Sequence, residues 1–271
     1  MSEYDVRHAH GLHVVHDGPR DAPPLVLIHG TGASGASWGP MVPALAAPHH
    51  VIRIDLAGCG KSAPAPPYDV PAQADRVAAV LDGLGLRAVA AAGHSSGGYV
   101  ATALAERRPD LVGPIALVST GPSPGALLRQ PLLLRALMAP PFGPILWPRR
   151  SDEMIRRGIK ATAALPVDIP DEVVADLRDM PYRTFRTMLR LNGEYIAERS
   201  VPERLAGLGL PVLALFGTAD PRWQPTSVHE YAVVPGARIE LLPGAGHMPM
   251  LEAAELTAEL LLSFTANRRV A

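Results

Sequence analysis

The sequence predicts an α/β protein with a parallel sheet covered by helices on both faces. Short continuous apolar runs recur along the chain, as expected of strands that are buried on both sides of a parallel sheet. Amphipathic helical patterns lie between several of these runs, and this alternation places helices on both faces of such a sheet. The chain has 271 residues, of which 48% are apolar, so it can bury one large core or two modest ones.

The chain starts with a predicted hairpin, residues 6–8 and 12–16, joined at His10-Gly11. The hairpin is rich in histidine, which raises the question of a metal site; these residues are His8, His10, His13 and His16. No cluster of carboxylates or cysteines completes a coordination shell. We therefore predict no metal and no other cofactor.

The core elements follow in order. The predicted strands after the hairpin are residues 24–29, 51–54, 88–92, 114–119, 211–216 and 238–242. A helix over residues 72–84 is indicated by apolar residues at helical spacing, such as Val77 and Leu81. A second helix runs through Tyr99 and ends before Pro109, and residues 252–264 form the closing helix.

The composition and hydrophobic pattern of the sequence change between residues 122 and 205. This segment has no strand-like run and many prolines, and its helical patterns cover residues 126–138, 152–164, 171–180 and 182–198. Helices inserted between two strands indicate a cap over the edge of the sheet. We therefore predict a core of residues 1–121 and 206–271 and a helical cap of residues 122–205.

A Gly-x-Ser-x-Gly pattern at residues 93–97 predicts a nucleophilic serine, Ser95, on a sharp turn between a strand and a helix. The pattern occurs twice more, at residues 35–39 and 121–125. The first of these has no strand running directly into it. In the second, a proline follows the serine and has no N–H to offer a developing oxyanion. Only Ser95 meets both requirements.

Two further residues stand after predicted parallel strands, Asp220 and His247. Because ligands bind at the carboxyl edge of open α/β sheets, we expect Ser95, Asp220 and His247 to meet there. Histidine can remove the serine proton near neutral pH, and a carboxylate can orient the imidazole. Taken singly, Asp220 could simply start a turn before Pro221 and His247 could be a loop residue, but the chain order serine, acid, histidine is that of a triad built on such a turn.

Two backbone donors are needed for the oxyanion that forms in acyl transfer. We expect them to be the N–H groups of Ser96 and Thr31, because Thr31 lies in the glycine turn after residues 24–29. His29 and His94 are expected to hold their turns.

Two glycine motifs resemble nucleotide-binding loops, but each lacks a part that such a loop needs. Residues 30–35 form a Gly-x-Gly-x-x-Gly after a strand, with Asp55 further on, but Pro40 and Pro43 disturb the helix that should bind pyrophosphate. Residues 55–62 end in Gly-Lys-Ser, but Asp55 stands where a phosphate-binding loop needs its first glycine. We therefore reject a nucleotide site at both motifs.

The single cysteine, Cys59, excludes an internal disulfide. No site pattern surrounds it, so it is expected to be a plain buried or loop residue.

The combined motifs resemble those of capped, single-domain α/β-hydrolases. The stretches that carry the resemblance are residues 29–32, 55–62, 93–98, 217–220 and 246–247. The resemblance implies an eight-stranded, mostly parallel sheet with an antiparallel hairpin strand and a cap after the sixth strand. It also implies Ser95 as nucleophile, His247 as base, Asp220 as acid, and Thr31 and Ser96 as oxyanion donors.

A serine on the turn disfavours the branches of this superfamily that use aspartate there. We expect hydrolysis of a carboxylic ester or thioester of a moderately hydrophobic small molecule through an acyl-Ser95 intermediate. C–C bond hydrolysis and biosynthetic cyclisation or acyl transfer stay open as alternatives on the same triad, and a slow receptor-like ligand-binding protein is the alternative outside catalysis. Residues expected at the substrate pocket are Trp38, Leu128, Met138, Phe142, Trp147, Met188, Trp223 and Met248.

The composition of the chain limits the classes of molecule that it is expected to bind. A net charge of −1 without a basic stripe argues against nucleic acid. The longest apolar region, residues 127–147, is broken by arginines and prolines, so we expect no membrane span. The polar start of the sequence and the single cysteine favour a cytoplasmic enzyme acting on a small molecule.

Overall fold

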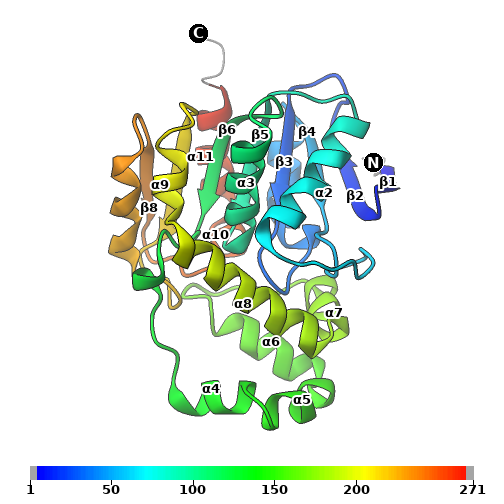
Figure 1. Ribbon diagram of the computed structural model, residues 1–271, viewed down its shortest axis with the longest axis vertical. Coiled ribbons are helices and arrows are strands. Elements are labelled where there is room, and N and C mark those ends of the chain that lie inside the picture. The colour runs from blue at the N-terminus through cyan, green and yellow to red at the C-terminus, as the bar shows by residue number, and fades with distance from the viewer. Residues whose placement is uncertain (1–4, 267–271) are drawn as a thin grey trace.

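The computed structural model describes residues 5–266, with the side chains of residues 5–9 left out, and its centre is an eight-stranded sheet (Figure 1). The strand order is β1-β2-β4-β3-β5-β6-β7-β8. The strands are β1 (Asp5–Ala9), β2 (Leu12–Asp17), β3 (Pro24–Ile28), β4 (His50–Ile54), β5 (Val89–His94), β6 (Val112–Val118), β7 (Val212–Gly217) and β8 (Arg238–Leu242). The predicted mostly parallel, eight-stranded sheet is confirmed.

The strand directions also follow the prediction. β1 pairs with β2 and β2 with β4 in antiparallel fashion, and every neighbour pair from β4 to β8 is parallel. The carboxyl ends of β5, β7 and β8 therefore open at one edge of the sheet. The side chain of His8, one of the four histidines of the hairpin, lies outside the described residues.

Helices cover both faces of the sheet because the strands alternate their apolar side chains. In β3, Val26 and Ile28 join the core beneath one set of helices, whereas Leu25 and Leu27 join the core on the opposite face. The first face carries α2 (Val70–Gly83), α3 (Ser96–Arg107), α9 (Val201–Leu205) and the 3₁₀ helix η4 (Pro225–Val233). The second carries the 3₁₀ helix η1 (Gly35–Met41), α1 (Val42–Leu45), α10 (Pro249–Glu252) and α11 (Ala254–Ala266).

The segment between β6 and β7 is helical and lies at one end of the sheet (Figure 1). Its elements before α9 are η2 (Pro124–Ala126), α4 (Leu132–Met138), α5 (Phe142–Leu146), η3 (Trp147–Arg149), α6 (Asp152–Lys160), α7 (Asp171–Asp179) and α8 (Tyr182–Glu198). We call residues 122–205 the insert. A helix α8 over residues 182–198 matches the predicted bounds.

Several predicted boundaries are wrong for local reasons. The helix expected over residues 126–138 begins only at Leu132, because Pro131 cannot supply an interior helical N–H and takes the N-cap position. The helix expected over residues 152–164 ends at Lys160. The closing helix is divided at Ala253 into α10 and α11.

Among the described residues, no helix is long and apolar enough to cross a bilayer.

Candidate active site

Ser95 lies on a strained turn between β5 and α3. Its backbone φ is 51° and ψ is −121°, a conformation that costs energy for any residue with a side chain and persists only where the surroundings enforce it. Close packing at the two flanking glycines holds Ser95 in this conformation. A Cβ on Gly93 would lie 2.5 Å from Gly97 backbone atoms, and one on Gly97 would lie 2.3 Å from the carbonyl oxygen of Ile28. The turn is therefore compatible only with glycine at these positions, and it leaves Ser95 half-buried at the sheet edge.

The structure brings Ser95, His247 and Asp220 into one chain of hydrogen bonds. His247 Nε2 lies 3.2 Å from Ser95 Oγ, and His247 Nδ1 lies 2.9 Å from Asp220 Oδ2. The other Asp220 oxygen, Oδ1, accepts hydrogen bonds from the backbone N–H groups of Arg222 (2.7 Å) and Trp223 (3.2 Å). The carboxylate is fully buried, so these bonds fix its orientation toward the imidazole.

The loop that carries His247 is held by Glu252, which the sequence reasoning missed. Glu252 Oε2 accepts the N–H groups of Gly246 (2.8 Å), Ala164 (2.7 Å) and Leu165 (3.0 Å), and Oε1 accepts that of Met248 at 2.9 Å. His247 N–H also donates to the Thr162 carbonyl oxygen at 2.9 Å. One carboxylate thus fastens both the histidine loop and the stretch after α6. The sequence carried no specific signal for this role, because residue 252 falls at the start of the predicted closing helix and its partners include two amides of the distant insert.

The two residues predicted to supply the oxyanion donors, Thr31 and Ser96, contact each other through their hydroxyl groups. Thr31 N–H donates to Ser96 Oγ at 2.9 Å, and Thr31 Oγ1 lies 2.8 Å from Ser96 Oγ. Asn192, on α8 of the insert, donates from Nδ2 to Thr31 Oγ1 at 2.8 Å. Asn192 was not among the predicted residues, because nothing local in the sequence shows which side of α8 faces the serine turn.

The number of hydrogens in this cluster of hydroxyl groups limits what it can still donate. Two N–H groups, from Asn192 and Thr31, donate into a pair of hydroxyls. Each hydroxyl has one hydrogen to donate, and the contact between Thr31 and Ser96 uses one of the two. One hydroxyl hydrogen is therefore left for an acceptor outside the cluster.

A small cavity of about 20 Å³ adjoins this cluster, which is room for about one water molecule. It is lined on the core side by residues such as Gly30 and Ser96, and on the insert side by Met188 and Asn192. Met188 is the only one of the eight predicted pocket residues that lines it.

The other predicted pocket residues lie elsewhere. Trp38 is fully buried in the core on the second face of the sheet, because η1 turns its indole inward. Trp147 is buried inside the insert, where Nε1 donates to the Met180 carbonyl oxygen at 2.7 Å. Trp223 packs its ring against Gly121, and Met248 is buried in the core of the second face. These side chains fill protein interior.

Three predicted pocket residues of the insert are open to solvent to different degrees. Leu128 is 37% exposed and Phe142 is 54% exposed. Met138 is half-buried and its carbonyl oxygen accepts a hydrogen bond from the Tyr182 hydroxyl. The structure places none of the three at the cavity beside Ser96.

The two histidines beside the turns have structural contacts. His29 Nδ1 donates to the Gly30 carbonyl oxygen at 2.8 Å and its Nε2 accepts Leu56 N–H at 2.9 Å. His94 Nε2 donates to the His247 carbonyl oxygen at 2.9 Å. Burial lowers the pKa of both imidazoles, so both stay neutral. The contacts of His29 fix which of its nitrogens donates and which accepts, and His94 donates from Nε2.

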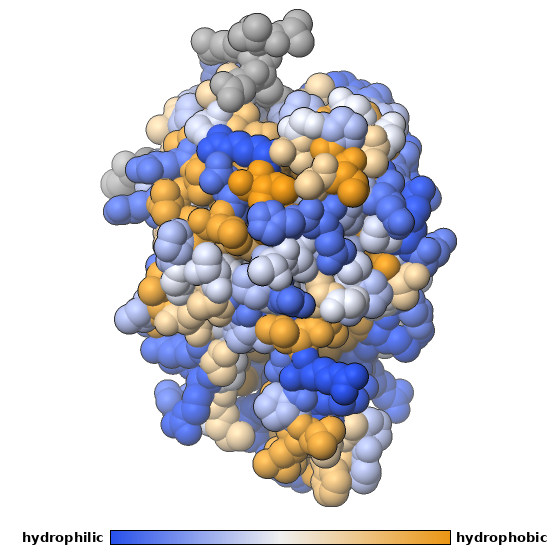
Figure 2. Space-filling view, turned by 90° about the vertical axis from the view of Figure 1, so that its left-hand side faces the viewer, coloured by the Kyte–Doolittle hydropathy of each residue, from blue (hydrophilic) through white to orange (hydrophobic). Residues whose placement is uncertain are grey.

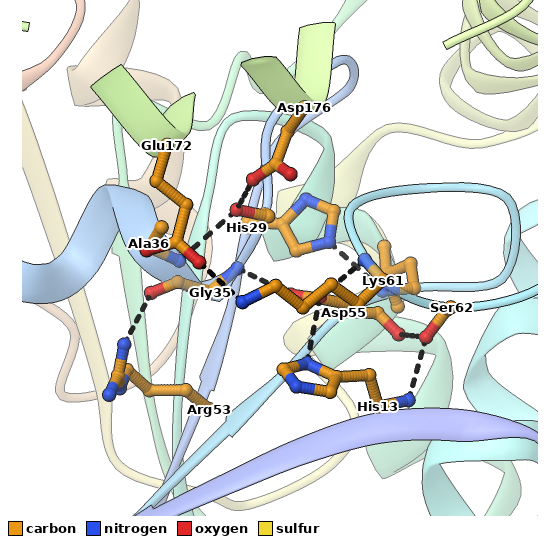
Figure 3. A network of polar contacts seen from close by, with 12 residues as sticks. His13, His29, Gly35, Ala36, Arg53, Asp55, Lys61, Ser62, Glu172 and Asp176 are labelled. Carbon is orange, nitrogen blue, oxygen red and sulfur yellow. Dashed lines mark hydrogen bonds and ion pairs between the residues drawn. The ribbon is translucent and has the colours of Figure 1, made fainter. Parts of the chain in front are cut away.

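Asp55 explains both glycine motifs that mimic nucleotide-binding loops (Figure 3). Its Oδ1 accepts Gly35 N–H at 2.7 Å, and its Oδ2 accepts Lys61 N–H at 2.9 Å and lies 2.9 Å from His13 Nδ1. Burial disfavours the charged carboxylate, but these hydrogen bonds outweigh burial and lower the pKa of Asp55. The two turns are thus organised around one internal carboxylate.

The same region ties the insert to the core. Lys61 Nζ lies 2.7 Å from Glu172 Oε1, and Ser34 Oγ donates to Asp176, with both acids on α7 (Figure 3). Burial raises the pKa of Asp176. A hollow of about 600 Å³ adjoins this network. Its charged lining residues have partners already, since Arg53 pairs with Asp17, Lys61 with Glu172, and Asp55 with His13.

Cys59 is buried and its thiol Sγ lies 3.8 Å from Met188 Sδ. Burial raises the pKa of Cys59 to about 12. The thiol is therefore protonated near neutral pH and is a poor nucleophile.

The fold and the contacts at the sheet edge define an α/β enzyme with a serine on a strand-to-helix turn, next to a histidine and an acid. The sequence profile of the alpha/beta hydrolase family matches residues 25–260. This chain belongs to that family, and it is a hydrolase.

Individual relatives agree with this assignment. The chain is 30% identical over 244 residues to a pimeloyl-[acyl-carrier protein] methyl ester esterase of Neisseria meningitidis, covering 89% of this chain and 92% of the relative. It is 26% identical to carboxylesterase YbfK of Bacillus subtilis, over 93% of this chain and 83% of the relative. Among solved structures, a bacterial membrane phospholipase A has a TM-score of 0.79 and 26% identity, covering all of this chain and 87% of the other.

Proposed function

We propose that this enzyme hydrolyses carboxylic esters of small molecules through an acyl intermediate on Ser95. The observation that carries the proposal is the hydrogen-bonded chain from Ser95 Oγ through both nitrogens of His247 to Asp220 Oδ2. Two relatives of the chain support the proposal, since one is a methyl ester esterase and the other is a carboxylesterase.

The first step forms a bond between Ser95 Oγ and the ester carbonyl carbon. His247 Nε2 accepts the serine proton as the bond forms, and the buried Asp220 carboxylate stabilises the resulting imidazolium. The carbonyl oxygen becomes an oxyanion. The leaving alcohol then departs with the proton from His247, which leaves an acyl-Ser95 ester and a neutral imidazole.

Water completes the cycle. His247 removes a proton from a water molecule, the hydroxide adds to the acyl carbon, and collapse of the second tetrahedral intermediate returns the proton to Ser95 Oγ. The products are a carboxylic acid and the regenerated hydroxyl.

The oxyanion is expected next to the backbone N–H groups of Ser96 and Thr31, and the Thr31 N–H would exchange its acceptor in this structure, Ser96 Oγ, for this oxygen. The hydroxyl hydrogen left over in the cluster of Thr31 and Ser96 is a further donor for the same oxygen, and Asn192 of the insert orients it. The insert thereby acts as a cap that contributes to the site as well as covering it.

The direct test is covalent labelling. A fluorophosphonate probe should add to Ser95, and mass spectrometry of the labelled peptide should locate the adduct within α3 and its turn. Ser95→Ala should lose labelling and lower kcat toward p-nitrophenyl esters by on the order of 10⁵-fold or more, with an unchanged circular dichroism spectrum. Full turnover by Ser95→Ala would refute the mechanism.

The ester panel also separates the alternatives. Steady turnover of p-nitrophenyl esters supports hydrolysis, whereas a burst equal to the enzyme concentration without turnover would indicate a slow ligand-trapping protein. Transfer of the acyl group to an added alcohol in preference to water would indicate an acyltransferase.

A further inference from the structure

The outer end of the insert exposes large apolar side chains. α4 and α5 lie at the lower end of the molecule in Figure 1, farther from the sheet than α6 and α8. We call this region the α4–α5 surface, and its exposed residues are Leu132 (78%), Leu133 (72%), Leu134 (47%), Leu137 (40%), Phe142 (54%), Ile145 (53%) and Leu146 (42%). Figure 2 shows apolar and strongly hydrophilic residues side by side at this end.

Helix α4 is unusual because none of its residues is buried. Leu132, Leu133 and Leu134 follow one another, so their side chains point about 100° apart around the helix axis. A flat, rigid partner surface covers one face of a helix and would leave part of this set in water. A fluid apolar layer can surround the helix on several sides.

The charge of the same stretch is one-sided. Residues 122–151 contain four arginines and no aspartate or glutamate, although the whole chain has a net charge of −1. Within the described part of the chain, Arg129, Arg135 and Arg149 form no ion pair, whereas arginines such as Arg107 and Arg108 pair with carboxylates. The unpaired guanidinium groups complement an anionic surface.

We propose that the α4–α5 surface docks onto the interface of an anionic lipid bilayer. Exposed leucines with arginines beside them are the composition of helices that lie in the headgroup region and bury their apolar side chains to a depth of about 5–10 Å. α4 has seven residues and is therefore about 10 Å long, far short of the roughly 30 Å hydrocarbon layer. It lies on the bilayer and does not span it.

The docked surface is connected to the serine site through the backbone. The chain leaves the core beside Asp220, where Leu128 N–H donates to the Arg222 carbonyl oxygen at 2.8 Å and Arg222 N–H donates to Asp220. Docking would thus place the end of the insert in the layer where apolar esters accumulate. The proposal itself concerns binding and does not depend on the hydrolytic mechanism.

The test is flotation of the full-length protein with vesicles. Vesicles of phosphatidylcholine mixed equally with phosphatidylglycerol should carry the protein upward, and vesicles of phosphatidylcholine alone should carry much less. Raising the salt concentration should weaken the binding, because the arginine contribution is screened. No flotation with the anionic vesicles, or equal flotation with both kinds, would overturn the proposal.

Paired variants identify the surface. Leu132→Gln and Leu133→Gln should each weaken partitioning by about tenfold, and Arg135→Glu should weaken it by at least about fivefold. The matched controls are Leu256→Gln on α11, where the leucine is 43% exposed, and Arg76→Glu on α2. The controls should bind as the unaltered chain does, and equal losses in variants and controls would overturn the assignment of the surface.

A second copy of the chain is the competing occupant. Light scattering coupled to size exclusion should give the same mass for the unaltered chain and for Leu133→Gln. A dimer that Leu133→Gln converts to monomer would show that this face binds another protein copy, and the lipid proposal would fall.

Discussion

The serine edge of the sheet and the outer end of the insert are built in opposite ways. At the serine edge, Asp220 and His247 are buried and each makes two or more hydrogen bonds. In α4 no residue is buried and the leucines face solvent. One region is therefore fixed by contacts within the chain, whereas the other has apolar area that the described residues leave uncovered.

The largest loss of activity at the serine edge, among the variants compared in this region, is expected for Asp220→Asn. The amide keeps the shape but cannot hold the imidazole in the required tautomer or stabilise its cation, so kcat should fall by about 10⁴-fold. Rates with a p-nitrophenyl ester measure the loss. Activity near that of the unaltered enzyme would mean that another carboxylate serves His247.

A smaller loss is expected for Glu252→Gln. The Glu252 carboxylate accepts four N–H groups, and a glutamine offers one acceptor oxygen in place of two. Because hydrogen bonds to a charged acceptor contribute about 1.5–3 kcal/mol each, kcat should fall by on the order of 10²-fold as the His247 loop loosens. The midpoint temperature of thermal unfolding should fall as well.

The control for this variant is Glu255→Gln, a nearby exposed acid at the start of α11. It should leave both kcat and the unfolding midpoint unchanged. Equal behaviour of the two variants would show that Glu252 does not position the histidine.

A loss of about tenfold is expected for Asn192→Leu. The leucine removes the N–H that donates to Thr31 Oγ1 at 2.8 Å, so the hydroxyl pair is free to reorient. A hydrogen bond is worth about 0.5–1.5 kcal/mol, and the upper end of that range corresponds to about tenfold in rate. The expected signature is a lower kcat with little change in KM, because the oxyanion is absent from the bound ester and forms only in the transition state and the tetrahedral intermediate that follows it. A change in KM alone would assign Asn192 to substrate binding.

The smallest effect belongs to the exposed region. Leu133→Ala should change the free energy of unfolding by less than about 0.5 kcal/mol, because the side chain makes few contacts to lose. Leu104→Ala, in the buried face of α3, should cost about 2–5 kcal/mol. Urea unfolding of both variants measures the contrast. Comparable losses would mean that Leu133 is covered in solution.

The core could be predicted from the sequence because its elements leave local patterns in the chain. A parallel strand buried on both faces leaves a continuous apolar run, and the turn at Ser95 needs glycines on both sides. The order of Ser95, Asp220 and His247 after their strands then predicts that they meet. These conclusions did not require knowledge of how the helices pack against one another.

The insert was less readable because its packing depends on contacts between distant helices. Helical spacing predicts α8 over residues 182–198, but not that Asn192 reaches Thr31 on the core. Apolar character alone placed Trp38 and Phe142 together in one pocket. The structure buries one in the core and exposes the other, because the same hydrophobicity serves either role and only the surroundings decide.

The four-fold acceptor at Glu252 has a consequence for engineering. Two of its partners, Ala164 and Leu165, belong to the insert, and two belong to the loop of the histidine. An insert transplanted from a related enzyme to change substrate preference would have to present two amides at the same place. A graft that omits them would loosen the His247 loop even if every residue of that loop were kept.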